Sequence, residues 1–373
     1  MAHNQLNCID LFSGAGGFSF SAAQAGFLVR LAIESDTHAA RTLSENIGSF
    51  QTEPCRVLNS DITELDPTSL ASQTFDAGTN CDVVLGGPPC QGFSTHRIRN
   101  AGVGDERNSL IHTYFEYVKA FKPKVFLLEN VPGMLWDRHR NYVEEFYRTG
   151  RTSGYHLEEP VVIDARDYGV PQRRKRVFIL GVSEDYSTEG LKWPPDPTHA
   201  NPMSKLKDSD LADWVNCRSA FFPAEEHDPN DIHMNHSAEL VEAFRNTPHN
   251  GGSRRDSGRV LPCHESHDGH KDVYGRIDPD LPAPTMTTAC INPSKGRFVH
   301  PTEDHGITAR QAARIQTFPD SVVFSGGLMA AGKQIGNAIP MKLGVLLLSH
   351  IKTFLSSFEE TNDMHPGENI AAE

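Results

Sequence analysis

A cysteine lies directly after two prolines at the end of a short apolar segment. Residues 82–85 are expected to form a buried strand, and Gly86-Gly87-Pro88-Pro89-Cys90-Gln91 follows it. The prolines restrict the backbone, so we expect Cys90 to be held at the carboxyl edge of a sheet. A free cysteine is usually a small buried hydrophobe, but a Pro-Pro-Cys-Gln turn that leads into a polar loop is a poor place to bury one. Cys90 is therefore a candidate nucleophile.

A carboxyl group follows a neighbouring strand in the same way. Glu129 comes directly after the apolar run of residues 124–128. Taken alone, it could equally be a helix N-cap or a surface acid. A thiol and a carboxyl group at adjoining strand ends suit the addition of a nucleophile to a ring that protonation has made electrophilic.

Three further segments could hold a cofactor of the adenosine type. Gly14-x-Gly16-Gly17 leads from a strand into a helix and would let the backbone approach a ligand, although a plain tight turn explains it as well. Glu34 follows the next strand, where a carboxylate can accept both ribose hydroxyls. Asp61 and Ile62 follow another, where the carboxylate could accept an adenine amino group and Ile62 could pack on the ring. Each acid could instead cap a helix, which is the commoner role.

The elements that must position these residues alternate in the first half of the chain as βαβ units do. This alternation predicts an α/β fold with an open, mostly parallel sheet. Strands are expected at residues 7–12, 28–33, 82–85, 124–128, 157–163 and 176–182, and helices at 18–25, 39–46, 110–121 and 141–149.

The composition changes after Gly181, where the chain becomes rich in His, Asn, Pro and Gly as far as about His305. This texture predicts a smaller, loop-rich second domain. Helices return at residues 309–317 and 335–354, and the last is long enough to cover the sheet of the first domain. The predicted divisions are a catalytic domain at 1–183, a second domain at 184–318, a returning C-terminal helix at 319–358, and an acidic, disordered tail at 359–373.

Charge and cysteine content narrow the class of protein. The 373 residues include 35 basic and 48 acidic ones, and the net charge of −13 taken alone argues against a polyanionic partner. Part of the excess lies in the acidic tail, and locally basic segments remain around the motifs. The seven cysteines form no Cys-x-x-Cys pair, which fits a reducing cytoplasm. We identify no export signal and no apolar stretch approaching the ~18 residues of a membrane span.

In their order along the chain, these motifs resemble those of the DNA (cytosine-5) methyltransferases of bacterial restriction-modification systems. The resemblance runs without permutation from about residue 7 to residue 350. It implies a Rossmann-like domain that binds S-adenosylmethionine and a smaller target-recognition domain. The motifs that carry it are residues 10–18, Glu34, Asp61, Pro88-Pro89-Cys90-Gln91, Glu129-Asn130-Val131, Gln172-Arg173-Arg174-Lys175-Arg176, residues 310–319 and residues 334–340.

The resemblance also implies a role for individual residues. Cys90 would add to C6 of a cytosine that has been flipped out of duplex DNA, while Glu129 donates toward N3. Arg174 and Arg176 alternate along a strand, so they would share one face and hold the base O2, a phosphate or Glu129. The polar residues 92–104 would close over the base.

The remaining site residues implied by the resemblance fall into two groups. Ser35 stands where many members have an aromatic residue that stacks on the adenine, which leaves Phe12 and Ile62 as the better candidates. The expected cofactor contacts are Phe12, Gly14, Gly16, Gly17, Glu34, Ser35, Asp61, Ile62, Pro89, Leu110 and Asn337. The expected DNA contacts are Gln91, Ser94, Arg97, Arg254 and Arg255, the last two in a glycine-rich basic segment whose alternative is a solvated loop.

Rival functions remain open at this point. A tRNA cytosine-5 methyltransferase would share these motifs, although the long insertion between Gly181 and Arg310 favours a reader of duplex DNA. A non-catalytic DNA-binding relative is disfavoured because Cys90 and Glu129 are intact. Cys263-His264-x-x-His267-x-x-His270 invites a metal, but no second ligand pair follows at finger spacing, so we expect none. The expected partner is double-stranded DNA, bound by a cytoplasmic monomer without a membrane and with a possible separate companion endonuclease.

Overall fold

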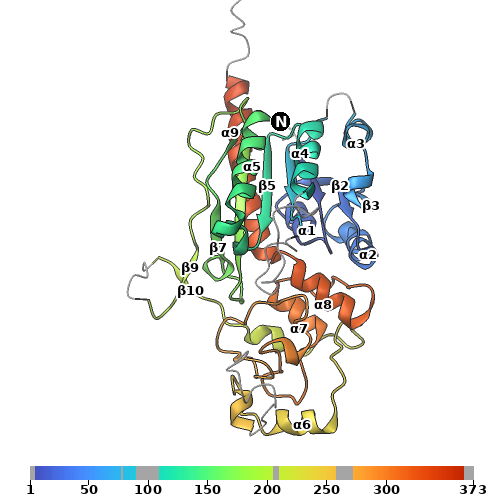
Figure 1. Ribbon diagram of the computed structural model, residues 1–373, viewed down its shortest axis with the longest axis vertical. Helices are drawn as coiled ribbons and strands as arrows, with labels where there is room; N and C mark the ends of the chain where they lie inside the picture. The colour runs from blue at the N-terminus through green and yellow to red at the C-terminus, as the bar shows by residue number, and fades with distance from the viewer. Residues whose placement is uncertain (1–4, 77–78, 90–108, 205–209, 258–271, 365–373) are drawn as a thin grey trace, which may run out of the picture.

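Eight strands form the central sheet of the computed structural model, which describes residues 5–76, 79–89, 109–204, 210–257 and 272–364 (Figure 1). The strand order is β3-β2-β1-β4-β5-β8-β6, and β7 also pairs with β8. The five strands from β3 to β5 are parallel, whereas β8 runs antiparallel to β5. The strands are β1 (Asn7–Leu11), β2 (Leu28–Glu34), β3 (Arg56–Asn59), β4 (Val83–Gly86), β5 (Val125–Asn130), β6 (Tyr155–Leu157), β7 (Val161–Asp164) and β8 (Lys175–Ser183).

The strand order reverses between β1 and β4, which are neighbours in the sheet but not in the sequence. In open α/β sheets, ligands bind in the crevice outside the carboxyl ends of the strands at such a switch point. The register places Leu11 of β1 beside Gly86 of β4, and Gly86 beside Leu128 of β5. The glycine turn after β1, the turn after β4 and Glu129 therefore meet at one edge.

Alternate strand residues point to opposite faces of the sheet, and helices cover both. On one face, Cys8 and Val83 pack with α1 (Gly17–Gln24) and α9 (Met341–Met364). On the other, Ile9 and Val84 pack with α4 (Ser109–Phe121) and α5 (Arg140–Thr152). Two further helices flank the parallel end, α2 (Thr37–Asn46) and α3 (Pro67–Thr74).

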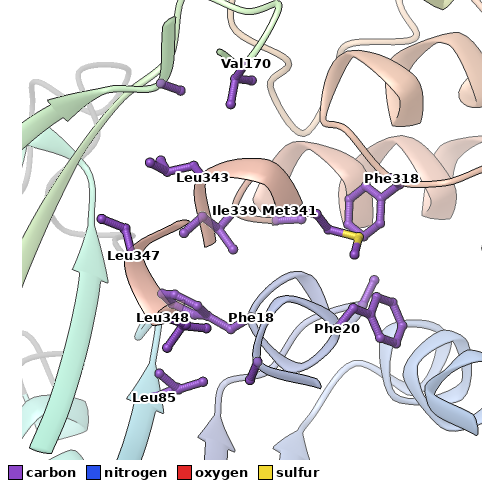
Figure 2. Packing of buried hydrophobic residues seen from close by; sticks show 14 of the residues in the cluster. Phe18, Phe20, Leu85, Val170, Phe318, Ile339, Met341, Leu343, Leu347 and Leu348 are labelled. Carbon is purple, nitrogen blue, oxygen red and sulfur yellow. The ribbon is translucent and has the colours of Figure 1, made fainter. Parts of the chain in front are cut away.

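The C-terminal part of the chain returns to the sheet domain as two helices. The sequence predicted one helix at residues 335–354, but α8 (Gly327–Asn337) and α9 are separate, because Pro340 cannot donate a helical hydrogen bond and disfavours helix in the residue before it. Leu343, Leu347 and Leu348 of α9 pack into the cluster that holds Phe18 of α1 (Figure 2).

The segment Gly327–Phe358 is long and apolar enough to span a membrane, with a mean hydropathy of 1.3. The sequence analysis, which counted only unbroken apolar stretches, did not mark it. It contains the break between α8 and α9, and 61% of its apolar window is buried within the protein. Its hydrophobic residues pack in the core beside α1 and β4 (Figure 2), as expected of a core helix.

Most predicted elements are confirmed, and the exceptions have local causes. The strand predicted at residues 157–163 is two strands, β6 and β7, separated at Pro160. The sequence analysis placed a strand before Asp61 but gave it no bounds, because β3 is an edge strand whose residues are exposed or half-buried and form no continuous apolar run. It missed α3, although Asp66 caps that helix and Pro67 occupies its first turn.

Residues 184–318 contain little regular structure in their described part, as the composition predicted. A buried arginine, Arg276, ties several loops of this region together. The region includes α6 (Ala238–Arg245), α7 (Ala309–Ile315), β9 (His199–Ala200), β10 (Ala212–Asp213) and the short helices η7 (Arg218–Phe221), η8 (Arg254–Ser257) and η10 (Pro293–Lys295). In Figure 1, α6 and α7 lie at the end of the molecule where α8 meets the sheet domain, whereas β9 and β10 lie beside the sheet domain. The core of the region is continuous with that of the sheet domain, so the division at residue 184 stays a prediction.

Candidate active site

An ion pair joins the end of β5 to β8. Arg176 Nε lies 2.8 Å from Glu129 Oε1, and both side chains are only 14% exposed. The contact lacks the alignment of a hydrogen bond, so Glu129 Oε1 has no hydrogen-bond partner among the described residues. Of the partners expected for the two arginines, the structure therefore brings together Arg176 and Glu129.

Asn130, which the sequence analysis did not single out, joins the end of β5 to the turn after β4. The buried Asn130 side chain donates from Nδ2 to Pro88 O at 3.3 Å, and its Oδ1 accepts from Val131 N at 2.8 Å. A Cβ at Gly87 would lie 3.5 Å from Glu129 Oε2, so this turn runs directly beside the carboxylate. The signal was present, because Asn130 directly follows Glu129 in the quoted motif.

The expected nucleophile and its loop lie outside the described residues. This applies to Cys90, to Gln91, Ser94 and Arg97, and to the rest of residues 92–104. The described chain ends at the exposed Pro89 and resumes at residue 109. The structure thus positions the turn that leads to Cys90 and leaves the role of that residue as a prediction.

The glycine turn after β1 has an unusual backbone. Phe12 has a φ of 57°, and Gly14 and Gly16 have φ of 56° and 98°. Phe12 is half-buried, and a bulky residue at positive φ is a strained conformation that clusters at functional sites. A Cβ at Gly14 would meet nothing within 4 Å, so this position keeps the open approach that the sequence predicted.

The other two glycines are explained by packing within the protein. A Cβ at Gly16 would lie 2.7 Å from the Phe20 ring, and one at Gly17 would lie 2.9 Å from Ile339 O. The need for glycine at these positions therefore comes from α1 and from the connection between α8 and α9. Steric access for a ligand, which the sequence analysis gave as their reason, is not required to explain them.

Glu34 links the end of β2 to the glycine turn. Its Oε2 accepts from Gly14 N at 2.8 Å, and its Oε1 accepts from Asp36 N at 2.7 Å. The helix-capping role that was the alternative for Glu34 belongs to Asp36, whose carboxylate accepts from two amides of α2. A hydrogen bond from Lys333 lowers the pKa of Asp36, and Ser35 between the two acids is exposed.

The two residues after β3 make contacts within the protein, and their predicted contacts with a cofactor stay predictions. Asp61 is exposed, and its Oδ1 accepts from Thr63 N at 2.9 Å and from Thr63 Oγ1 at 2.7 Å, so the helix-cap alternative describes this contact. These hydrogen bonds lower the pKa of Asp61. Ile62 is only 4% exposed and packs in the core, so it has little surface to offer an adenine ring. Phe12 is the better candidate for stacking.

Asp10 is a buried carboxyl group beneath the glycine turn that the sequence analysis did not count among the site residues. It is 1% exposed at the end of β1, and Ser19 Oγ donates to its Oδ2 at 2.6 Å. Its Oδ1 has no hydrogen-bond partner among the described residues. Burial raises the pKa of Asp10 to about 7. Its position as the first residue of the quoted glycine motif was the available signal.

Two other predicted cofactor contacts come from distant parts of the chain. Asn337 is exposed at the end of α8. The contact of Gly17 with Ile339 brings this helix end to the glycine turn. Leu110 is half-buried in the first turn of α4, on the other side of the sheet.

Comparison with known proteins decides the family. A family model described as C-5 cytosine-specific DNA methylase matches residues 6–353. The chain belongs to this family. It is accordingly an enzyme of the DNA (cytosine-5) methyltransferase class.

Relatives and solved structures agree with this assignment. The methylase is 34% identical to the type II methyltransferase M1.BsuMI of Bacillus subtilis, over 92% of this chain and 80% of that protein. It is 30% identical to M.DdeI of Desulfomicrobium norvegicum, over 96% and 91% of the two chains. A putative DNA modification methyltransferase from an Escherichia coli prophage has the same fold, with a TM-score of 0.69, 24% identity and coverage of 94% and 100%.

One predicted catalytic residue of the methylase, Arg174, bonds to backbone carbonyl groups. Arg174 is 1% exposed, and its guanidinium donates to Met286 O, Gly336 O and Ala338 O at 2.8, 3.0 and 2.9 Å. β8 begins only at Lys175, so the strand alternation from which a shared face with Arg176 was predicted does not extend to Arg174, and the shared face stays a prediction.

The two predicted DNA-binding arginines of the second region also differ. Arg254 is buried, at 6% exposure, whereas Arg255 is exposed on the same short helix. Only Arg255 therefore presents its side chain to solvent, and the expectation that both guanidinium groups reach outward is corrected for Arg254. Cys263, His264, His267 and His270 lie outside the described residues.

Proposed function

We propose that this methylase transfers a methyl group from S-adenosylmethionine to C5 of a cytosine flipped out of a specific duplex DNA sequence. The observation that carries the proposal is the Glu129–Arg176 ion pair at the end of β5, beside the turn that leads to Cys90. A thiol at Cys90 would work together with the Glu129 carboxyl group, which supports nucleophilic addition to a protonated ring.

The residues at the ends of β1 and β2 fit S-adenosylmethionine. Asp10 Oδ1 is buried without a hydrogen-bond partner among the described residues, and the sulfonium cofactor carries a cationic amino group that can donate to it. Glu34 is half-buried at the end of β2, where a carboxylate can accept ribose hydroxyls. Phe12 would offer its ring to the adenine, and Gly14 and Asn337 offer polar backbone and side-chain groups.

When bound, S-adenosylmethionine supplies an electrophilic methyl group. Cys90 adds as a thiolate to C6 of the cytosine while Glu129 donates toward N3, and C5 becomes nucleophilic as the ring loses its aromaticity. Arg176 holds the Glu129 carboxyl in place and balances its charge. After methyl transfer, a base takes the C5 proton, Cys90 leaves C6 as a thiolate, and the N3 proton returns to Glu129, which restores the aromatic base.

The substrate class and cellular role follow from the relatives. M.DdeI and M1.BsuMI are named type II methyltransferases, so we assign this protein to a restriction-modification system with a companion endonuclease that acts separately. A cytoplasmic monomer that binds duplex DNA through the loop after Cys90 and through Arg255 of the second region fits this role.

A trapping experiment tests the reaction. A duplex containing 5-fluorocytosine at the target should form a covalent adduct with the wild-type protein. Fluorine replaces the C5 proton whose loss would release Cys90. Cys90→Ser should form none. An undiminished adduct from the serine variant would refute Cys90 as the nucleophile. Methyl transfer to tRNA but not to duplex DNA would refute the substrate class.

A further inference from the structure

The Arg174 guanidinium is buried where three parts of the chain meet. It lies just before β8 and donates to Met286 O of the loop-rich region and to Gly336 O and Ala338 O of the C-terminal segment. These three carbonyls come from segments more than 100 residues away in the sequence. The mechanism proposed above does not use this residue.

Two of the three bonds flank a single exposed residue, Asn337. Gly336 and Ala338 are its neighbours on either side, and the chain leaves helical conformation at Ala338. Carbonyl groups at the end of a helix have no intrahelical partner, and a cation is favourable there because of the helix dipole. Arg174 satisfies this end of α8 and fixes the peptide groups on both sides of Asn337.

A second side chain strengthens this clamp. Gln316 Nε2 donates to Ile335 O at 2.6 Å and to Ala338 O at 2.9 Å. Gln316 Oε1 in turn accepts from Gln172 Nε2 at 2.7 Å, two residues before Arg174. The end of α8 is therefore held from one buried side, and the Asn337 side chain is exposed.

The clamped helix end also contacts the glycine turn. A Cβ at Gly17 would lie 2.9 Å from Ile339 O and 3.2 Å from the Ala338 side chain. Ser21 Oγ of α1 donates to Met341 O at 3.2 Å. The position of Asn337 relative to the turn after β1 is thus fixed through its neighbours.

We propose that Arg174 is a positioning residue for the cofactor, which acts by holding Asn337 at the crevice and makes no contact with the reacting atoms. The inference rests on the proposed function, because Asn337 is there assigned to the cofactor. The proposal gives the two arginines of the motif different roles. Arg176 orients Glu129, and Arg174 orients Asn337.

The chemistry of the side chain makes the proposal testable with a conservative variant. The planar guanidinium spans carbonyls from two segments with separate nitrogens, whereas the lysine ammonium is a compact point charge that cannot span the same fork. Arg174→Lys keeps the positive charge at the end of α8. The variant loses some of the hydrogen bonds to the carbonyl groups on either side of Asn337.

The experiment is a double-mutant cycle on cofactor binding, measured by calorimetry with S-adenosylmethionine. Arg174→Lys and Asn337→Ala should each weaken binding about tenfold, the effect of losing one good hydrogen bond. The double variant should bind no more weakly than Asn337→Ala alone, because Arg174 acts through that side chain. The KM for the cofactor should rise, and kcat at saturating cofactor should change less than threefold.

Two controls separate positioning from loss of structure. Arg173→Lys, at the exposed neighbouring position, should leave cofactor affinity unchanged. Gln316→Asn, which withdraws the second donor to Ala338 O while Arg174 stays, should show the same lack of additivity with Asn337→Ala. This variant keeps the test decisive if Arg174→Lys does not fold.

The outcomes are distinct. Additive losses in the cycle, or wild-type affinity in Arg174→Lys, would overturn the positioning role even though the protein binds its cofactor. Wild-type affinity in Asn337→Ala would overturn it as well. If the wild-type protein itself does not bind S-adenosylmethionine, the proposed function has failed and not merely this inference.

Discussion

The sheet domain and the loop-rich region are held together in different ways. In the sheet domain, strand ladders satisfy the backbone, and the strand ends bring Asp10, Glu34 and Glu129 to one edge. In the loop-rich region and at its junction with the sheet, buried arginines bond to the backbone carbonyls of loops. The three largest fully buried side chains of the described residues are Arg174, Arg276 and Arg310.

Arg276 shows what such a side chain contributes. Its nitrogens donate to Thr247 O, Phe244 O, His300 O and Glu303 O, and Nη2 lies 2.7 Å from Asp304 Oδ1. A loop-rich region has few strand pairs that could donate hydrogen bonds to its backbone carbonyls. One planar guanidinium with five N–H donors supplies these hydrogen bonds instead. At the sheet edge, a reactive side chain can therefore be replaced while the strand ladders still stabilise the fold. In the loops, replacing one buried arginine removes the hydrogen bonds that stabilise the region.

The largest expected effect is on catalysis at the sheet edge. Glu129→Gln keeps an oxygen beside Arg176 but removes the group that donates toward N3. We expect kcat on duplex DNA to fall roughly a thousandfold, the usual contribution of a general acid. The free energy of unfolding should fall by only about 1 kcal/mol, since the amide has nearly the same shape and keeps a polar oxygen beside Arg176.

The control for this prediction is Glu116→Gln, an exposed glutamate on α4 that pairs only with Lys119 among the described residues. It should retain wild-type rate and stability. If Glu129→Gln lost stability in proportion to its activity, Glu129 would stabilise the fold as well as act in the reaction. The contrast between the sheet edge and the loops would then be wrong.

The second prediction concerns the loop-rich region, where stability should fail first. Arg276→Met fills similar volume but leaves four carbonyls and Asp304 without their shared partner. We expect the free energy of unfolding to drop by about 3 kcal/mol, because the backbone carbonyls that Arg276 bonds lose their buried donor. Denaturant unfolding would measure this loss, and calorimetry should show S-adenosylmethionine affinity within twofold of wild type.

Arg245→Met is the matched control for Arg276→Met. Arg245 contacts the same Asp304 at 3.5 Å but is 61% exposed, so its loss should cost less than about 0.5 kcal/mol. Equal losses in the two variants would mean that the buried arginine does not organise these loops.

The sequence predicted residues at strand ends better than residues whose position depends on the packing of loops. Buried parallel strands read as apolar runs, and their carboxyl ends share one edge, so Glu129 and Glu34 could be placed from the sequence alone. Glu129 was one of three partners predicted for Arg176, beside the base O2 and a phosphate. The structure pairs the two residues, because Arg176 lies within β8. Arg174 could not be placed, since it precedes the strand and its three acceptors depend on tertiary packing.

In the loops, residue type gives little information about burial. A Gly-Gly-Ser-Arg-Arg segment suggests exposed cations, yet Arg254 is buried and only Arg255 is exposed. The caps show the same limit on a smaller scale. Asp36 caps α2 while Glu34, two residues earlier, bonds the glycine turn, and the spacing alone does not tell which acid takes which role.

The smallest expected effect is a pH dependence confined to the loop-rich region. His300 is 7% exposed, and its Nδ1 accepts from Thr302 N at 3.2 Å and Glu303 N at 2.9 Å. An imidazole nitrogen that accepts two amide protons must be unprotonated. Burial, together with nearby His305, Arg276 and His233, lowers the pKa of His300 from 6.5 to about 4.

The neighbouring groups favour the same neutral state. His305 lies 5.4 Å from His300 and stacks on His233 at 3.9 Å between ring centroids. Phe221 packs against the His300 ring, edge to face. Arg276 donates to the His300 carbonyl, and the backbone amide of Glu303 donates to the His300 ring. Two imidazoles, one guanidinium and an aromatic ring thus face a ring that cannot gain a proton without losing its bonds.

The sign of the effect follows from linkage. Above pH 6.5 the ring is neutral in both the folded and the unfolded chain, so pH has no effect through it. As pH falls from 6.5 toward 4, the unfolded chain binds a proton that the folded chain refuses, and stability is lost. We expect this ring to contribute a loss of about 2 kcal/mol over that interval, discounted for its partial contact with solvent.

His300→Asn isolates this contribution, because an amide oxygen can accept the same N–H groups and does not titrate. The free energy of unfolding, measured by denaturant at pH 7.5, 5.5 and 4.5, should fall less steeply in the variant than in the wild type. His227→Asn, at a position 89% exposed, should follow the wild-type slope. Parallel slopes for His300→Asn and the wild type would place the acid sensitivity elsewhere, and the loop-rich region would then owe its stability to its arginines and not to its neutral imidazoles.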